Sequence, residues 1–347
     1  MRPLTERGML DGGVPPPVDG TLRDRIARRF LSAAVGASLL ASPRPAALLV
    51  RRRFAATGAL MAQDLERHAG PGVVALTDER YGEEPDMLLD LYRPAGLSDS
   101  LPLLVWVHGG AFIGGAKEEV AGYLKLLAAG GHVVAAPRYS LAPEHRYPAP
   151  PRQVLRAVEH LQASAGRLGV DPGRIAIAGD SAGAHIAAQV AALVTTPGYA
   201  DAVGVAPTIA PGQLRALVLA CGPYDLGLAR QVTSAAGRRF MQIVLWAYSG
   251  RRRFLDDPAF AAWSVADNVS SAFPPVLLTA GNADPLAPHS RLLAERLHDL
   301  GVEVETLFFP DDHDPPLGHE YQFELDTDAA RGFLERLLAF LRQRLGR

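Results

Sequence analysis

The apolar positions from residue 73 onwards fall into eight short runs, and these runs predict eight β-strands. Residues 103–107 and 175–178 are unbroken apolar segments, as strands covered on both faces require. The predicted strands span residues 73–79, 87–92, 103–108, 133–137, 175–179, 216–220, 276–280 and 302–309.

Stretches with helical periodicity alternate with these runs. Strands that alternate with helices are typical of a parallel sheet with helices on both faces. Only residues 82–86 join the first two strands, and because this link is too short for a crossover we expect those strands to be antiparallel. The sequence therefore predicts an α/β fold with a mostly parallel eight-stranded sheet. The predicted helices span residues 118–129, 151–168, 181–193, 289–300 and 327–345.

Further helices are expected before the strands and between two of them. Residues 1–20 include three consecutive prolines and predict a flexible lead, whereas residues 21–68 show helical spacing that Pro43 and Pro45 break into two or three helices. No strand pattern covers residues 222–272, which include bulky apolar side chains. We therefore divide the chain into a lead with cap helices (1–70) and a main domain (71–347) with a cap insertion at about 222–272.

Composition narrows the range of partners. Of the 347 residues, 48% are hydrophobic and 21% are charged, so the chain can bury a large core. The net charge of -2 argues against nucleic acid as a partner, since no excess of one sign attracts it. The only cysteine, Cys221, excludes an internal disulfide and any multi-cysteine metal site, and we expect it to be small, apolar and buried. A monomer and a homodimer both stay open.

The chain has no run of 18 or more apolar residues, which argues against a membrane-spanning helix. Residues 28–42 loosely resemble an export signal with a paired arginine, but charges of both signs precede this segment. We therefore expect a cytoplasmic protein in which the segment forms helical cap material.

Gly179-Asp180-Ser181-Ala182-Gly183 fits the pattern G-x-S-x-G between a predicted strand and a predicted helix. A nucleophilic serine needs that context, because a sharp, strained turn with small neighbours leaves its hydroxyl exposed. A tight turn with an incidental serine is the alternative. The flanking strand and helix weaken it, so we predict that Ser181 is a nucleophile.

His108-Gly109-Gly110-Ala111 follows another predicted strand and indicates backbone donors for an oxyanion. Glycines let backbone N–H groups approach a developing negative charge closely. We assign the donor role to Gly110, Ala111 and Ala182. A flexible loop whose histidine caps its own turn is the alternative, but two such motifs at the carboxyl ends of two strands favour a site.

A serine hydroxyl needs a histidine as base and a carboxylate that orients the histidine. Asp284 lies just beyond the strand at 276–280, where the acid belongs in the chain order Ser, acid, His, although it could instead cap the next helix. Two histidines follow the last strand. We prefer His319, which comes after a long loop, over His313, which stands among three carboxylates.

Together these motifs resemble the hormone-sensitive-lipase-like family of bacterial esterases, within the α/β-hydrolase superfamily. The resemblance covers the chain from about Asp90 to the C-terminus. The motifs are Asp90-Leu91-Tyr92-Arg93-Pro94, His108-Gly109-Gly110-Ala111, Tyr139-Ser140-Leu141-Ala142-Pro143-Glu144-His145, Gly179-Asp180-Ser181-Ala182-Gly183 and Asp284-Pro285.

The resemblance implies an α/β-hydrolase fold with a helical cap, a triad of Ser181, Asp284 and His319, and an oxyanion hole at Gly110 and Ala111. Two positions depart from the family pattern. Ala111 replaces a third glycine, and Glu320-Tyr321 stands where Gly-Phe often follows the catalytic histidine.

The activity implied by the resemblance is that of a serine carboxylesterase, which hydrolyses short- to medium-chain esters through an acyl-enzyme without cofactor or metal. An amidase or peptidase could use the same triad. A lipase at a membrane surface is a further alternative, motivated by the apolar N-terminal helices and the arginines at 51–53, whose plainer interpretation is cap packing with a solvated basic patch. A non-catalytic small-molecule receptor on a hydrolase scaffold is least favoured, because every triad residue is present.

Overall fold

The computed structural model describes residues 41–97 and 99–346, and the chain divides into two compact units, Met1–Ser42 and Pro43–Arg347. The fold belongs to the second unit. The predicted flexible lead, the helices expected before residue 41 and most of the export-like segment lie outside the described residues. Within the described part of the chain, no helix combines the length and the apolar character needed to cross a membrane.

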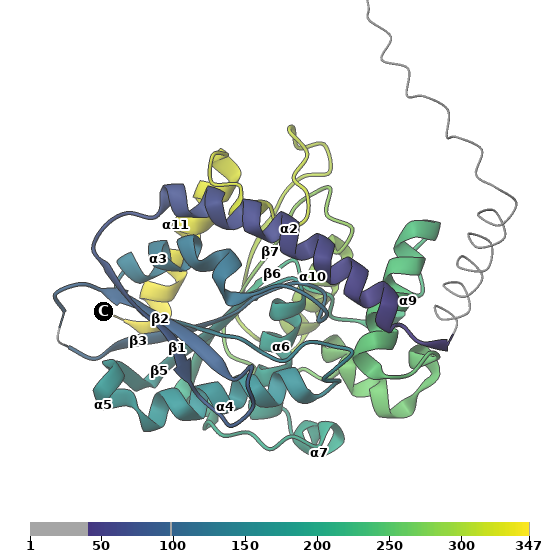
Figure 1. Cartoon of the computed structure of the whole chain (residues 1–347), viewed down its shortest axis with the longest axis horizontal. Helices are drawn as coiled ribbons and strands as arrows, with labels where there is room; N and C mark the ends of the chain where they lie inside the picture. The colour runs from purple at the N-terminus through teal and green to yellow at the C-terminus, as the bar shows by residue number, and fades with distance from the viewer. Residues whose placement is uncertain (1–40, 98, 347) are drawn as a thin grey trace, which may run out of the picture. The chain divides into compact units, whose positions relative to one another are not determined.

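An eight-stranded sheet forms the centre of the molecule, in the order β1-β2-β4-β3-β5-β6-β7-β8 (Figure 1). β1 and β2 are antiparallel, as the short link between them predicts. β2 also runs antiparallel to β4, and all other neighbouring strands are parallel, so the predicted sheet is confirmed. The strands are β1 (Val73–Arg80), β2 (Leu88–Pro94), β3 (Leu101–Val107), β4 (Val133–Pro137), β5 (Val170–Asp180), β6 (Leu214–Ala220), β7 (Val276–Ala280) and β8 (Val304–Phe308).

The five helices predicted between and after the strands are present, two of them in pieces. The first is a 3-10 turn, η1 (Lys117–Val120), followed by α3 (Ala121–Ala129), and the second is α4 (Ala149–Ala163) followed by α5 (Ala165–Leu168). The other three are α6 (Ala182–Thr195), α10 (Ala287–Asp299) and α11 (Asp328–Leu345). Short connecting segments are α7 (Tyr199–Val203), η2 (Pro211–Gln213) and η6 (Tyr321–Phe323).

The helix before the sheet is α2 (Arg44–His68). The prediction that prolines break this region is wrong for Pro45, which lies in the first turn of α2. Proline is tolerated there because the backbone N–H groups of a first turn have no helical partner to lose. Pro43 is the N-cap residue and marks the boundary of the helix instead.

Residues 222–272 contain helical segments and no strand. One of these helices meets α2 although the two are far apart in sequence, since the ring centroids of Phe54 and Phe240 are 6.3 Å apart. The segments are α8 (Leu226–Ala229), α9 (Ala235–Ser249), η3 (Phe254–Asp256), η4 (Pro258–Trp263) and η5 (Val265–Asp267).

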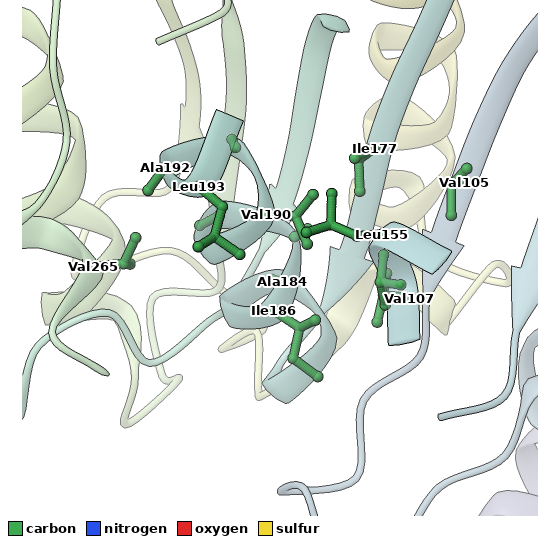
Figure 2. Packing of buried hydrophobic residues seen from close by; sticks show 14 of the residues in the cluster. Val105, Val107, Leu155, Ile177, Ala184, Ile186, Val190, Ala192, Leu193 and Val265 are labelled. Atoms are coloured by element: carbon green, nitrogen blue, oxygen red, sulfur yellow. The ribbon is translucent and has the colours of Figure 1, made fainter. Parts of the chain in front are cut away.

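Each face of the sheet has its own hydrophobic core. On one face, Val105 and Val107 of β3 pack in a cluster with Ile186 and Val190 of α6 (Figure 2). On the other face, the alternate β3 residue Trp106 packs in a cluster with side chains of α3 and α11. All residues of α6 are buried, so the helix that follows the predicted nucleophile is held firmly inside the fold.

Candidate active site

Ser181 occupies the turn between β5 and α6, where the motif predicts it. Its backbone has φ 50° and ψ −119°, a conformation that non-glycine residues rarely adopt. The turn is tight because glycines flank it. A Cβ placed on Gly183 would lie 1.9 Å from the carbonyl oxygen of Val107, so this position accepts no side chain without movement.

His319 and Asp284 lie beside this serine. Oγ of Ser181 is 2.9 Å from Nε2 of His319, and Nδ1 of His319 is 3.0 Å from Oδ2 of Asp284. With the ring proton on Nδ1, His319 donates to Asp284 and accepts a hydrogen bond from the Ser181 hydroxyl. The three residues selected from the sequence are therefore brought together in the order that nucleophilic catalysis requires.

Asp284 follows β7, and its side chain is fully buried. While Oδ2 faces His319, Oδ1 accepts a hydrogen bond from the N–H of Leu286 at 2.7 Å. Leu286 is the N-cap residue of α10. Because this bond is to the N-cap residue itself and α10 has no side-chain cap hydrogen bond, the structure favours the histidine contact over the helix-capping alternative, and the two contacts together orient the carboxylate.

The competing histidine, His313, lies elsewhere on the same loop. Its ring stacks on Phe309 with centroids 4.9 Å apart, and its backbone N–H donates to the carbonyl of Pro310 at 3.0 Å. The structure therefore brings His319, and not His313, to Ser181.

Cys221 is buried beside His319 at the end of β6, and burial raises the pKa of its thiol. Burial alone would lower the pKa of His319, but Cys221, the hydrogen bond to Asp284 and the carboxylate of Glu320 outweigh it, so this pKa lies well above its usual value. Because a thiol with a raised pKa is neutral at neutral pH, the two carboxylates are the charges that favour the imidazolium.

The predicted oxyanion donors lie in the loop after β3 and at the start of α6. Gly110 and Ala111 have φ values of 109° and 53°, and a Cβ on Gly110 would lie 2.2 Å from the carbonyl oxygen of Gly114. Within the described residues, no backbone carbonyl accepts a hydrogen bond from the N–H of Gly110, Ala111 or Ala182. These three N–H groups are available to an oxyanion.

Tyr139, to which the sequence motifs assign no role of its own, supports this loop through its hydroxyl and its ring. Its hydroxyl lies 3.0 Å from the carbonyl oxygen of His108 and 3.2 Å from that of Gly109. The Tyr139 ring also stacks on the His108 imidazole, with centroids 4.4 Å apart. Its only signal in the sequence is membership of the motif that begins at Tyr139.

Arg51 of α2 also contacts the loop that contains Gly110 and Ala111. Its guanidinium donates to the carbonyl oxygens of Ile113 at 2.6 Å and Ala142 at 2.7 Å, and it pairs with Glu144 at 2.6 Å. The interpretation of residues 51–53 as a solvated basic patch is therefore wrong for Arg51. Charge alone does not distinguish Arg51 from its two neighbours in the sequence.

Asp180 and Glu320 are two further carboxyl groups beside the site, and no sequence motif assigns either of them a role. Asp180 is buried, and its Oδ1 accepts a hydrogen bond from Nε1 of Trp106 at 2.8 Å. Burial, and then the Glu320 carboxylate, raise the pKa of Asp180 well above its usual value. Oε1 of Glu320 lies 3.9 Å from Nε2 of His319, and the only sequence signal for it was the departure from Gly-Phe.

A cavity of about 850 Å³ lies over Ser181 and His319. Side chains of α2 and α9, including Phe54, Met61 and Phe240, form much of its apolar wall. Among the described residues, the lining includes no lysine or arginine. Its acidic members are Glu119, Asp180, Asp225 and Glu320.

Cys221, Asp284 and His319 have ligand atoms within 4.8 Å of one another, a spacing that a metal ion could use. Both ring nitrogens of His319 are already engaged with Ser181 and Asp284. A metal ion would have to displace one of these hydrogen bonds, so this arrangement fits proton transfer better than metal binding.

Comparison with known proteins identifies a matching family model and similar relatives. A family model described as alpha/beta hydrolase fold matches residues 104–313. Carboxylesterase NlhH of Mycobacterium tuberculosis is 30% identical to this chain over 267 residues, which cover 75% of this chain and 79% of NlhH.

Solved structures share the fold. An esterase from Pyrobaculum calidifontis is 23% identical with a TM-score of 0.69, covering 86% of this chain and 92% of its own. Esterase B from Lactobacillus rhamnosis is 21% identical with a TM-score of 0.73, covering 86% of this chain and 96% of its own.

Proposed function

The chain belongs to the hormone-sensitive-lipase-like carboxylesterase family of the α/β-hydrolase superfamily and is a carboxylic ester hydrolase, and on this basis we propose that it is a serine esterase with Ser181 as nucleophile. The observation that supports this mechanism most directly is the pair of contacts that His319 makes, 2.9 Å to Ser181 and 3.0 Å to Asp284. These contacts allow His319 to take the serine proton while Asp284 holds the ring.

The first half of the reaction forms the acyl-enzyme. Nε2 of His319 takes the hydroxyl proton as Oγ of Ser181 attacks the ester carbonyl carbon, and the carbonyl oxygen becomes an oxyanion. The N–H groups of Gly110, Ala111 and Ala182 donate to that oxyanion. The bond to the alcohol oxygen then breaks, and Nε2 returns the proton to the departing alcohol.

The second half releases the acid. A water molecule gives a proton to Nε2 of His319 and attacks the acyl carbon, which restores a tetrahedral intermediate with the same oxyanion donors. The bond to Oγ breaks, Ser181 regains its proton, and the carboxylic acid leaves. The protein needs no cofactor in this scheme because His319 returns each proton that it takes.

We propose that α2 and the helices of residues 222–272 form a cap over the site. Phe54 and Phe240, one from each part, meet and line the same cavity. An apolar wall of this kind accepts an acyl chain by excluding water from it. A cavity of about 850 Å³ suits short- to medium-chain esters.

The decisive test measures hydrolysis of 4-nitrophenyl esters, from acetate to decanoate, by the wild type and four variants. We expect Ser181→Ala and His319→Ala each to lower turnover by roughly 10⁴ or more, and Asp284→Asn by a comparable factor, since triad members act as a unit. His313→Ala, the matched control, should stay within a small factor of the wild type. If the two histidine variants exchanged their behaviour, the assignment of His319 would be wrong.

An interfacial lipase is a second candidate, favoured by exposed apolar side chains on α2 and α9. Leu49 and Leu60 are 70% and 67% exposed, and Phe240 is 40% exposed. Such side chains can contact an oil or membrane surface. Activity that rises sharply when tributyrin passes from solution into emulsion would support a lipase, whereas a smooth saturation curve would support the esterase.

Two simpler measurements address the remaining alternatives. Faster turnover of 4-nitroanilides than of the matching esters would indicate an amidase or peptidase. Failure of a fluorophosphonate to label Ser181 would indicate a non-catalytic receptor. A cytoplasmic location and the choice between monomer and homodimer remain predictions, which cell fractionation and sedimentation would test.

A further inference from the structure

Glu320 occupies a backbone position that suits glycine. Its φ of 62° and ψ of 29° lie in the left-handed region, where a residue with a side chain is disfavoured. This chain has a glutamate there, so the side chain is the feature that needs an explanation.

The Glu320 carboxylate faces the edge of His319 that carries out proton transfer. Its Oε1 lies 3.9 Å from Nε2 of His319 and lines the cavity, whereas Asp284 contacts the opposite nitrogen, Nδ1. A Cβ on Gly109 would lie 2.8 Å from the same Oε1, which places the carboxylate against the start of the oxyanion loop. The imidazole ring is thus flanked by a carboxylate at each nitrogen.

Among the described residues, no lysine or arginine lines the cavity beside this carboxylate. Burial, and then Glu320, raise the pKa of Asp180 of β5 well above its usual value. Burial likewise raises the pKa of Glu119 of η1 to about 7. His108 and His289 also line the cavity, and burial lowers the pKa of each to about 4, so both are neutral at neutral pH. Cys221 is a neutral thiol.

We propose that Glu320 is a positioning residue for the catalytic base, whose carboxylate stabilises the His319 imidazolium from the Nε2 side each time the ring holds a proton. This role rests on the proposed function of His319 as the general base. An anion about 4 Å from a titrating group favours its charged form. Since only neutral imidazole can accept the Ser181 proton, Glu320 moves the acidic limit of activity to higher pH.

The test is the pH dependence of kcat/KM for 4-nitrophenyl butyrate in the wild type, Glu320→Gln and Glu320→Gly. The glutamine keeps the side-chain shape without the charge, and the glycine removes the side chain while suiting the backbone, so the glycine variant should fold. In both variants the midpoint of the acidic limb should fall by about one pH unit. Glu324→Gln, an exposed carboxyl close by in the chain, is the control and should leave the midpoint unchanged.

A midpoint within about 0.2 pH unit of the wild type in both Glu320 variants would overturn the proposal, as would a shift in the glycine variant alone, which indicates a backbone effect. The titration of His319 is also followed by NMR of the imidazole nitrogens, with His319→Ala identifying the signal. This readout separates the two proposals. If the wild type failed to hydrolyse esters, the proposed mechanism would be wrong, yet a lower His319 pKa in Glu320→Gln would still support the contact.

Discussion

At the scale of single residues, the turn that carries Ser181 can form only because Gly183 has no side chain. Its Cα approaches the backbone of Val107 so closely that an added Cβ would lie 1.9 Å from the carbonyl oxygen. We expect Gly183→Ala to lower the free energy of unfolding by about 1–3 kcal/mol or more, because backbone must move. Urea unfolding measures the effect.

Gly332→Ala is the matched control for that measurement. Gly332 lies inside α11, and an added Cβ there would meet no atom within 4 Å. Alanine is favoured over glycine in a helix interior by roughly 0.5–1 kcal/mol, so this variant should be slightly more stable than the wild type. Equal losses in both variants would contradict the packing explanation.

At this scale the sequence was sufficient to select Ser181, Asp284 and His319, which the structure brings together, but not to select the other residues that contact His319. Ser181, Asp284 and His319 could be selected because each follows a predicted strand in a fixed chain order. Cys221 is far from His319 in the chain and no motif relates the two, whereas Glu320 follows His319 directly but its residue type alone does not show that its carboxylate turns back to the ring. Such contacts depend on side-chain directions after folding, which hydrophobic periodicity does not contain.

At the scale of elements, α2 is bound to the oxyanion loop through Arg51. The guanidinium reaches the carbonyl oxygens of Ile113 and Ala142 together. We expect Arg51→Ala to lower kcat roughly tenfold with little change in KM, because a misplaced oxyanion loop weakens transition-state binding more than substrate binding. Steady-state kinetics with 4-nitrophenyl butyrate checks this.

Two further variants sharpen the interpretation. Arg51→Lys should recover only part of the activity, because an ammonium group lacks the planar fork that spans two carbonyl oxygens. Arg52→Ala removes an exposed neighbouring charge and should behave as the wild type. An equal loss in Arg51→Ala and Arg52→Ala would point to the net charge of α2 instead of the loop contact.

The types of the elements were predictable because buried strands need apolar runs. The residues at which the elements begin and end were less predictable. β5 begins at Val170, five residues before the predicted start at residue 175. Residues 171–174 (Asp-Pro-Gly-Arg) form no apolar run, yet the start of β5 pairs with β3 through Leu101 and Val170. Backbone pairing at a sheet end leaves no hydrophobic pattern, so the sequence does not report it.

At the scale of the whole molecule, segments from most of the chain enclose one cavity whose charged lining, among the described residues, is acidic. An anionic substrate should therefore be disfavoured. We expect kcat/KM for mono-4-nitrophenyl adipate to be about tenfold below that for 4-nitrophenyl hexanoate, a difference of about 1.4 kcal/mol. The two acyl chains differ only at the end remote from the ester.

Ionic strength provides the control for this comparison. Salt screens charges that are exposed to solvent, so the ratio between the two esters should shrink between low and high salt. Equal rates for the two esters at low salt would contradict an acidic cavity. A ratio that does not respond to salt would point to poor fit of the terminal carboxyl group instead of charge.

Cys221 is the only thiol in the chain, and it is buried beside His319. A thiol reagent can modify it only when this part of the fold transiently opens, because the closed structure shields the sulfur. The modification rate therefore measures how often the structure around His319 opens. Comparison with the denaturant stability of the whole fold would show whether that region opens alone or only when everything unfolds.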